Sequence, residues 1–136
     1  MTKLKTTYLG NLRTKCVHES SGAVVETDAP KDNQGKGESF SATDLFSVSL
    51  GACILTSMGI AAEKAGIDLK GATVDVEKEM TSVPTRRIHR LIVRFRANVA
   101  PNPEERKKLE HVALNCPVRV NLNPEIKLEI DFVWGL

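Results

Sequence analysis

The sequence predicts an α+β fold whose sheets are largely antiparallel. Residues 41–66 form a long and almost uncharged run with the length of a helix, whereas residues 70–81, 88–99 and 127–134 alternate apolar and polar side chains as strands do. After the long helix the order is two strands, a second helix and a last strand, so strands and helices do not alternate strictly. This order favours an α+β fold over a doubly wound parallel sheet.

The composition is that of an ordinary globular protein. The chain has 136 residues, enough for a real core, and we expect a single domain over residues 1–136. A hydrophobic fraction of 41% and a charged fraction of 26% exclude a disordered or fibrous chain. The net charge of +2 is too small to indicate a nucleic-acid partner, and none is expected.

The cysteine count and the apolar segments bear on the cellular compartment. Three cysteines at long spacings do not form a disulfide framework. Residues 1–10 lack the apolar core of a signal peptide, so we expect a cytoplasmic protein. The uncharged run at residues 46–62 is shorter than the roughly 20 apolar residues that span a bilayer, and no membrane association is expected. In a reducing compartment a cysteine pair is more often catalytic or redox-active than structural.

The central helix is predicted over residues 41–66. Ser41 followed by Asp44 fits a capping box, and Gly66 suits the position just after a helix. The run is rich in small residues, which let another backbone approach closely. Because it carries almost no charge, we expect a helix enclosed on nearly all sides by protein. Cys53 lies near its middle.

Turn residues divide the N-terminal part. Residues 5–18 are predicted to be extended with a turn at Gly10-Asn11, and residues 20–22 form a hairpin-type turn. Residues 23–27 are the returning strand. Residues 28–40, rich in Gly, Pro, Asp and Lys, form a loop that either is functional or carries the chain to the central helix.

In the C-terminal part, residues 82–85 contain a proline and turn the chain between two strands. Pro103 suits the first turn of a second helix that ends near Leu114. A short helical piece is predicted near Cys116, before Asn123-Pro124 interrupts the chain. Phe132 and Trp134, in the last strand, are expected in the core or at an interface.

Cys53 and Cys116 can be interpreted in two ways from the residues alone. Cysteine is among the most buried residue types, so both side chains could simply pack in the core. Alternatively they form a redox pair, because Cys116 precedes Pro117 at a predicted helix start, where backbone N–H groups favour a thiolate. The sequence does not place the two cysteines close together, and both interpretations remain open.

The run SATDLFSVSLGACILTSM at residues 41–58, followed by NCPV at residues 115–118, resembles the OsmC/Ohr family of osmotically inducible and organic hydroperoxide resistance proteins. The resemblance extends over nearly the whole chain. It implies an intertwined homodimer in which largely antiparallel sheets wrap two central helices, with two active sites at the interface. It also implies thiol-dependent reduction of organic hydroperoxides, with Cys53 as the peroxidatic residue and Cys116 as the resolving residue.

The resemblance further implies an arginine that activates the thiolate. In the family it lies nine residues before the turn glycine, and counting back from Gly22 gives Arg13. The hydroperoxide-resistance branch carries a glutamate ten residues before the cysteine to orient this arginine, and here that position is Thr43. Asp44, one place later, is a further candidate site residue. It either orients Arg13 or caps the helix through Ser41, and capping is the favoured interpretation.

The leading hypothesis is therefore an antioxidant thiol-dependent peroxidase of the oxidative stress response, acting on organic hydroperoxides with an external dithiol reductant. No metal or organic cofactor is expected, because sulfur carries the two electrons. Apolar side chains of the central helix would favour an organic hydroperoxide over hydrogen peroxide. These side chains are Leu45, Val48, Ile54 and Leu55.

Two other functions remain as alternatives. One is a non-catalytic dimer that binds a small apolar or thiol-reactive ligand with Cys53 as a contact, which Thr43 in place of the glutamate favours. The other is a purely structural dimer in which Cys53 only packs. A zinc site is not predicted, because Cys16, His18 and the remaining histidines lack metal-ligand spacing, and Cys16 is expected to be an inert strand cysteine.

Overall fold

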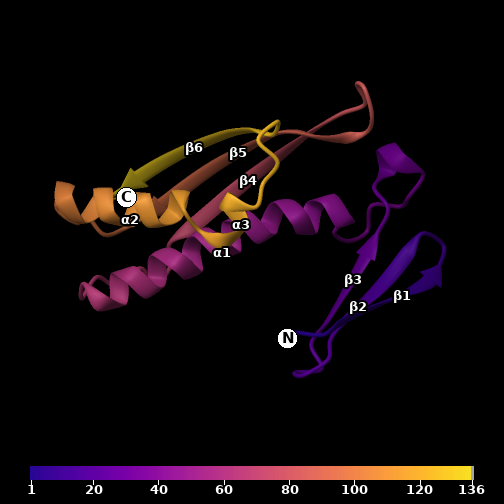
Figure 1. Cartoon of the computed structure of the whole chain (residues 1–136), viewed down its shortest axis with the longest axis horizontal. Coiled ribbons are helices and arrows are strands. Elements are labelled where there is room, and N and C mark those ends of the chain that lie inside the picture. The colour runs from indigo at the N-terminus through magenta and orange to yellow at the C-terminus, as the bar shows by residue number, and fades with distance from the viewer. Residues whose placement is uncertain (136) are drawn as a thin grey trace. The chain divides into compact units, whose positions relative to one another are not determined.

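The structure, a computed structural model, describes residues 1–135 and contains two compact units. The N-terminal unit is Met1–Phe46 and the C-terminal unit begins at Ser47. Each unit has one three-stranded sheet, β1-β2-β3 in the first and β4-β5-β6 in the second (Figure 1). Three of the four strand pairings are antiparallel, so the predicted α+β fold with largely antiparallel sheets is confirmed.

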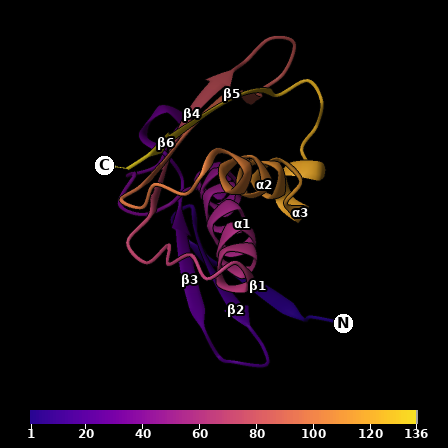
Figure 2. The ribbon, with the colours of Figure 1, turned by 90° about the vertical axis from the view of Figure 1, so that its left-hand side faces the viewer.

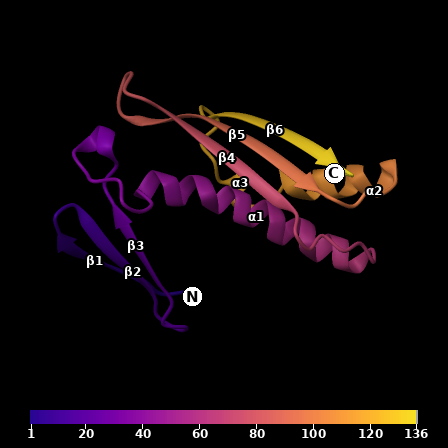
Figure 3. The same cartoon turned by 180° about the vertical axis from the view of Figure 1, so that it is seen from behind.

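The N-terminal unit is an antiparallel meander of β1 (Leu4–Gly10), β2 (Arg13–His18) and β3 (Val24–Asp28). The predicted turn at Gly10-Asn11 joins β1 to β2, and the predicted turn ending at Gly22 joins β2 to β3. Both glycines have positive φ, of 82° and 76°, a conformation that glycine adopts without steric cost. The loop after β3 contains one 3₁₀ turn, η1 (Lys31–Asn33), as Figure 3 shows from behind.

The N-terminal unit has no apolar core among the described residues. Its buried side chains are Thr27, Asp28 and Ser41, and all three are polar. Its large apolar side chains are exposed instead: Leu4, Tyr8, Leu9, Leu12, Val24, Val25, Phe40 and Phe46. Exposed apolar side chains gathered on a small sheet mark a surface that contacts other protein.

The C-terminal unit is built on β4 (Thr73–Thr81), β5 (Arg87–Ala97) and β6 (Lys127–Trp134), with β5 in the centre. β4 and β5 are antiparallel, whereas β5 and β6 are parallel. Two parallel neighbouring strands need a long crossover connection between them, which is usually helical. Here the crossover contains α2 (Pro103–Leu114) and α3 (Pro117–Val120).

Helix α1 (Ala42–Lys64) supplies one face of the core of the C-terminal unit. Figure 2 shows α1 and α2 on the same side of the β4-β5-β6 sheet. The buried residues of α1 recur at helical spacing: Ser47, Leu50, Gly51, Ile54, Met58 and Ala62. Gly51 permits the closest approach, because a Cβ at this position would lie 3.3 Å from Val74 Cγ1 and 3.4 Å from Val76 Cγ2. The rest of the core comes from Ile88, Leu91, Val93, Phe95, Ala97, Leu109, Ala113 and Cys116.

Aromatic rings of β5 and β6 complete this core. The ring centroid of Phe95 lies 5.8 Å from that of Phe132 and 4.8 Å from that of Trp134, both in tilted arrangements. The indole N–H of Trp134 donates to Glu110 Oε1 of α2 at 3.0 Å, so its polar atom is satisfied. Phe132 and Trp134, expected in the core or at an interface, are partly buried and pack against the core.

The expectation that protein encloses the central helix on nearly all sides is wrong for the single chain. A stripe at spacing four remains exposed on α1: Val48, Ala52, Thr56 and Ile60. Within residues 1–135, α1 is also the one helix whose length and composition would allow it to cross a membrane. Its buried residues contribute to the core described above. One face of α1 is covered by its own chain and the other is not.

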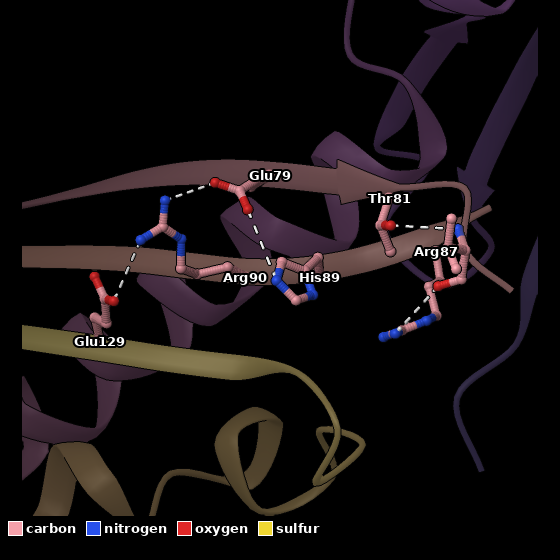
Figure 4. A network of polar contacts seen from close by, with 7 residues as sticks. Glu79, Thr81, Arg87, His89, Arg90 and Glu129 are labelled. Atoms are coloured by element: carbon pink, nitrogen blue, oxygen red, sulfur yellow. Dashed lines mark hydrogen bonds and ion pairs between the residues drawn. The ribbon is translucent and has the colours of Figure 1, made fainter. Parts of the chain in front are cut away.

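The face of the β4-β5-β6 sheet that carries the charged side chains has a network of ion pairs (Figure 4). Arg90 of β5 contacts Glu79 Oε2 of β4 at 2.6 Å and Glu129 Oε1 of β6 at 3.4 Å. His89 lies 3.9 Å from the other oxygen of Glu79. Arg90 thus links all three strands, and its charge lowers the pKa of Glu79 through a hydrogen bond and coulombic attraction.

Candidate functional site

The structure brings Cys53 and Cys116 together. Cys53 lies in the middle of α1, and Cys116 is the residue that caps the N-terminus of α3. The backbone N–H of Val118 donates to Cys53 Sγ at 3.5 Å, and that of Arg119 donates to Cys116 Sγ at 3.4 Å. Both cysteines are free thiols, and their sulfurs accept from successive backbone N–H groups of the same turn. The first turn of α3 therefore holds both sulfurs with backbone donors.

The two thiols differ in their surroundings. Cys116 is 1% exposed, whereas Cys53 is half-buried. Burial raises the pKa of Cys116, and the neighbouring Cys53 raises it further, while the backbone N–H groups of Arg119 and Val118 lower it. The expectation that the helix start favours a thiolate at Cys116 is therefore wrong in its net effect, because desolvation outweighs the backbone donors.

Arg13, the first residue of β2, is held by two carboxylates of the N-terminal unit. Its Nη2 lies 2.5 Å from Glu38 Oε2 and 3.7 Å from Asp28 Oδ2. The hydrogen bond to Glu38 is the largest cause of a raised pKa of Arg13, followed by the charges of Glu38 and Asp28. The guanidinium is thus charged and oriented by the loop that follows β3.

Asp44 forms the predicted capping box with Ser41. Its Oδ2 accepts the N–H of Ser41 at 2.9 Å, and its own N–H donates to Ser41 Oγ at 3.0 Å. Arg13 and Asp44 belong to the N-terminal unit, whereas Cys53 and Cys116 belong to the C-terminal unit. A contact between Arg13 and Cys53 remains a prediction.

Sequence reasoning missed Glu38 and Asp28 as partners of Arg13. Asp28 faces Arg13 in the register of β2 and β3, a pairing that follows from the lengths of the turn and strands. Glu38 lies 25 residues from Arg13 and only the folding of the loop brings it there. The single sequence signal was the set of glycines around Glu38, which indicates a loop but not what it contacts.

Cys16 lies in β2, where Thr6 Oγ1 donates to its Sγ at 3.7 Å. Within the described 135 residues, no three His, Cys, Asp or Glu side chains are grouped so that they could hold a metal ion. Cys16 belongs to the N-terminal unit, whereas Cys53 and Cys116 belong to the C-terminal unit, and it offers an internal comparison for them.

Two cavities of the C-terminal unit lie along the second half of α1. One, of about 570 Å³, is lined by Leu55, Gly59 and Glu63 of α1 and by residues 66–70 and 72. The other, of about 680 Å³, lies between α1 and α2. Its lining consists of Ala61, Lys64, Ala65, Ile67, Glu105, Lys107, Lys108, Leu109, His111 and Val112. Neither cavity is lined by Cys53 or Cys116.

Comparison with known proteins gives a family match and many similar folds. The model of a family described as OsmC-like protein matches residues 35–131, more than half of the chain. A search among curated proteins finds no match. The matched segment includes α1, Cys53 and Cys116 but not β1 or β2.

Among solved structures, one from Psychrobacter arcticus 273-4, described as a candidate osmotic stress induced and detoxification response protein, has 41% sequence identity. It matches with a TM-score of 0.91 over 97% of this chain and 96% of that chain. The organic hydroperoxide resistance protein OsmC of Legionella pneumophila has 16% identity and a TM-score of 0.77 over 98% and 96%. An OsmC-like protein of Mycoplasma pneumoniae has 12% identity and a TM-score of 0.83 over 100% and 98%. The last two show a shared fold.

Proposed function

Because the chain belongs to the OsmC-like protein family, we propose that it is a cytoplasmic, homodimeric thiol peroxidase that reduces organic hydroperoxides. The observation that carries the proposal is the placement of two free thiols, Cys53 and Cys116, at the same turn, where their sulfurs accept from neighbouring backbone N–H groups of α3. A thiol peroxidase that protects itself by disulfide formation needs a second sulfur within bonding reach of the first. Here that sulfur comes from a segment far along the chain.

The roles of the two thiols follow from their exposure. A hydroperoxide can reach the half-buried Cys53 but not Cys116, which is 1% exposed. The backbone N–H of Val118 donates to Cys53 Sγ at 3.5 Å. The raised pKa of Cys116 keeps its proton in place while Cys53 reacts. Cys53 is therefore assigned as the peroxidatic residue and Cys116 as the resolving residue.

The reaction proceeds in three steps. The Cys53 thiolate attacks the distal peroxide oxygen, the O–O bond breaks, and the alkoxide takes a proton and leaves as an alcohol. Cys53 is now a sulfenic acid. The Cys116 sulfur attacks the Cys53 sulfur, its proton leaves with the hydroxyl as water, and a disulfide forms. An external dithiol then reduces this disulfide by thiol exchange and becomes oxidised itself.

Arg13 is the residue proposed to activate Cys53. A guanidinium keeps its charge at any working pH, and it can stabilise the thiolate and donate to the departing oxygen. The hydrogen bond to Glu38 raises the pKa of Arg13 further, which supports a permanently charged side chain. We take residues 1–136 to be a single functional domain. In the proposed dimer, Arg13 would contact Cys53.

Two surfaces support the homodimer. The apolar side chains of the β1-β2-β3 sheet have no apolar core of their own, and the stripe on α1 at Val48, Ala52, Thr56 and Ile60 is exposed. Exposed apolar surfaces of this kind mark protein interfaces. A second copy of the chain would cover these surfaces.

The proposal is tested by following the consumption of cumene hydroperoxide and hydrogen peroxide with a dithiol reductant. We expect turnover of cumene hydroperoxide by the wild type, its loss in Cys53→Ser, and overoxidation of Cys53 by mass spectrometry in Cys116→Ser. Cys16→Ser is the matched control and keeps wild-type turnover. A folded wild-type protein that consumes neither peroxide would falsify the peroxidase. Equal turnover of both peroxides would remove the preference for organic substrates.

The second candidate function is binding of a small apolar ligand without catalysis. The cavity of about 680 Å³ favours it, because its lining includes the apolar side chains of Ile67, Leu109 and Val112. A fluorescent fatty acid is a suitable probe. Saturable binding by a wild type that lacks peroxide turnover would favour this function over the peroxidase.

A further inference from the structure

Arg13 receives its two carboxylates from different segments. Glu38 belongs to the chain between η1 and α1, and Asp28 is the last residue of β3. Both contact the same atom, Nη2 of Arg13, at 2.5 Å and 3.7 Å. Both carboxylates therefore hold the guanidinium through one terminal nitrogen.

Asp28, in strand β3, binds the backbone of Glu38 through a hydrogen bond. Its side chain is buried, and its Oδ2 accepts the backbone N–H of Glu38 at 2.9 Å. In the strand register Asp28 lies directly opposite Arg13. The other oxygen of Asp28, Oδ1, is buried without a hydrogen-bond partner in the described part of the chain. A buried carboxylate needs compensation, which Arg13 and the Glu38 N–H supply.

The loop between Asp28 and Glu38 is closed by its own backbone. Gly37 donates to the carbonyl of Ala29 at 3.1 Å, and Gly35 donates to that of Pro30 at 2.9 Å. Position 35 has no room for a side chain, since a Cβ there would lie 1.8 Å from the oxygen of Ala29. The loop therefore returns on itself and delivers Glu38 to a fixed place beside Asp28.

Backbone strain marks the residue just before Arg13. Leu12 has a φ of 63°, a backbone conformation that residues other than glycine adopt at an energetic cost. Its carbonyl accepts the N–H of Ala29 at 3.2 Å, and its own N–H donates to the hydroxyl of Tyr8 at 3.3 Å. The same loop thus fixes both the backbone before Arg13 and the end of its side chain. Strain of this kind persists where the surroundings enforce it.

We propose that Glu38, anchored on Asp28, is the positioning residue that aims Arg13 at the reacting sulfur and peroxide. This inference rests on the proposed peroxidase function. It assigns the orienting role to the loop, since the position at which the related branch carries its glutamate is Thr43 and Asp44 is engaged in the capping box with Ser41. The raised pKa of Arg13, caused first by the hydrogen bond to Glu38, agrees with this geometry.

The test compares Glu38→Gln, Glu38→Asp and the control Glu19→Gln, which removes the same charge from an exposed turn of the same unit. Glu38 is suitable because its side chain is 59% exposed, so its replacement spares the fold. With cumene hydroperoxide and a dithiol we expect Glu38→Gln to lower kcat about 10- to 100-fold with little change in KM. Glu38→Asp recovers part of the loss, and Glu19→Gln equals the wild type.

A second readout does not depend on turnover. In ¹⁵N NMR spectra the Nε–H signal of Arg13 should show a restrained guanidinium in the wild type and in Glu19→Gln, and a freely averaged one in Glu38→Gln. Wild-type kcat together with an unchanged Arg13 signal in Glu38→Gln would overturn the positioning role while leaving the peroxidase intact. Absence of turnover in the wild type, with the Arg13 signal still lost in Glu38→Gln, would remove the reaction but retain Glu38 as the residue that orients Arg13.

Discussion

The backbone N–H of Val118 donates to the Sγ of Cys53 at 3.5 Å, although the two residues are 65 positions apart. One residue further on, the backbone N–H of Arg119 donates a hydrogen bond to the sulfur of Cys116. The first turn of α3 therefore acts on both members of the cysteine pair. It compensates for part of the burial of Cys116 and supplies Cys53 with a donor that its own helix cannot provide, since backbone N–H groups inside α1 bond to carbonyls.

The first prediction concerns the titration of Cys116. Because burial raises its pKa, its thiolate should form above the ordinary thiol value of about 8.5. The measurement is thiolate ultraviolet absorbance against pH in Cys16→Ser/Cys53→Ser, where Cys116 is the remaining cysteine. Burial persists in this variant, so the raised value should persist. A midpoint at or below the ordinary value would contradict the assignment of Cys116 as the protonated, resolving thiol.

The same shift predicts a dependence of stability on pH. A raised pKa in the folded state means that the folded protein holds this proton more tightly than the unfolded one. The stabilisation is complete below the unfolded pKa and is lost as the pH rises through the folded pKa. Denaturant unfolding of the wild type and of Cys116→Ala should therefore differ less as the pH rises through this alkaline window. A constant difference would show that Cys116 does not titrate there.

The third prediction concerns the capping box of α1. Ser41→Ala removes the acceptor for the N–H of Asp44 and should lower the free energy of unfolding by about 1 kcal/mol. The control is Thr85→Ala, in the exposed turn between β4 and β5, which should stay within about 0.5 kcal/mol of the wild type. Denaturant unfolding measures both. Equal effects of the two substitutions would show that the capping contact does not stabilise the helix.

The fourth prediction concerns the two central glycines of α1. A side chain at Gly51 would press on Val74 and Val76, so Gly51→Leu should destabilise the protein by at least about 1–3 kcal/mol through overpacking. Gly59 has open space around its Cβ position, and Gly59→Ala should gain up to about 1 kcal/mol from helix propensity. Thermal unfolding of both variants provides the comparison. Tolerance of leucine at position 51 would disprove the close contact between α1 and β4.

The fifth prediction concerns the ion pairs on the charged face of the β4-β5-β6 sheet. The hydrogen bond and charge of Arg90 lower the pKa of Glu79, so the stabilisation is present above the unfolded pKa and is lost as the pH falls through the folded pKa. In Arg90→Gln the Glu79 carboxyl should titrate at a higher pH than in the wild type. Carboxyl ¹³C NMR follows this directly. An unchanged titration of Glu79 would mean that solvent screens the pair in Figure 4.

Local signals in the sequence were sufficient for the elements. Ser41, Asp44 and Gly66 bounded the central helix at residues 41–66, and the structure has it at Ala42–Lys64, because caps act within one turn. The alternation at residues 127–134 matched β6, Lys127–Trp134. Each of these features depends on neighbours a few positions away, which a single sequence displays.

Features that depend on contacts between residues far apart in the sequence could not be predicted from it. The parallel register of β6 beside β5 follows from the crossover, and the contact of Glu38 with Arg13 follows from a loop closed by backbone hydrogen bonds. Apolar character also did not say which way a side chain faces. Ile54, expected beside Leu55 in a substrate lining, is fully buried in the core and is not available to a peroxide.

The distribution of the core has a consequence for how the chain is made. Its buried apolar residues begin at Leu50, so residues 1–46 are synthesised before any residue of the apolar core. Strand β6, which follows all other described elements, pairs with the central strand β5 and must arrive before that sheet is complete. The apolar side chains of the N-terminal sheet are therefore made before the core of the C-terminal unit exists. Cells that make this protein quickly should depend on chaperones that bind this segment.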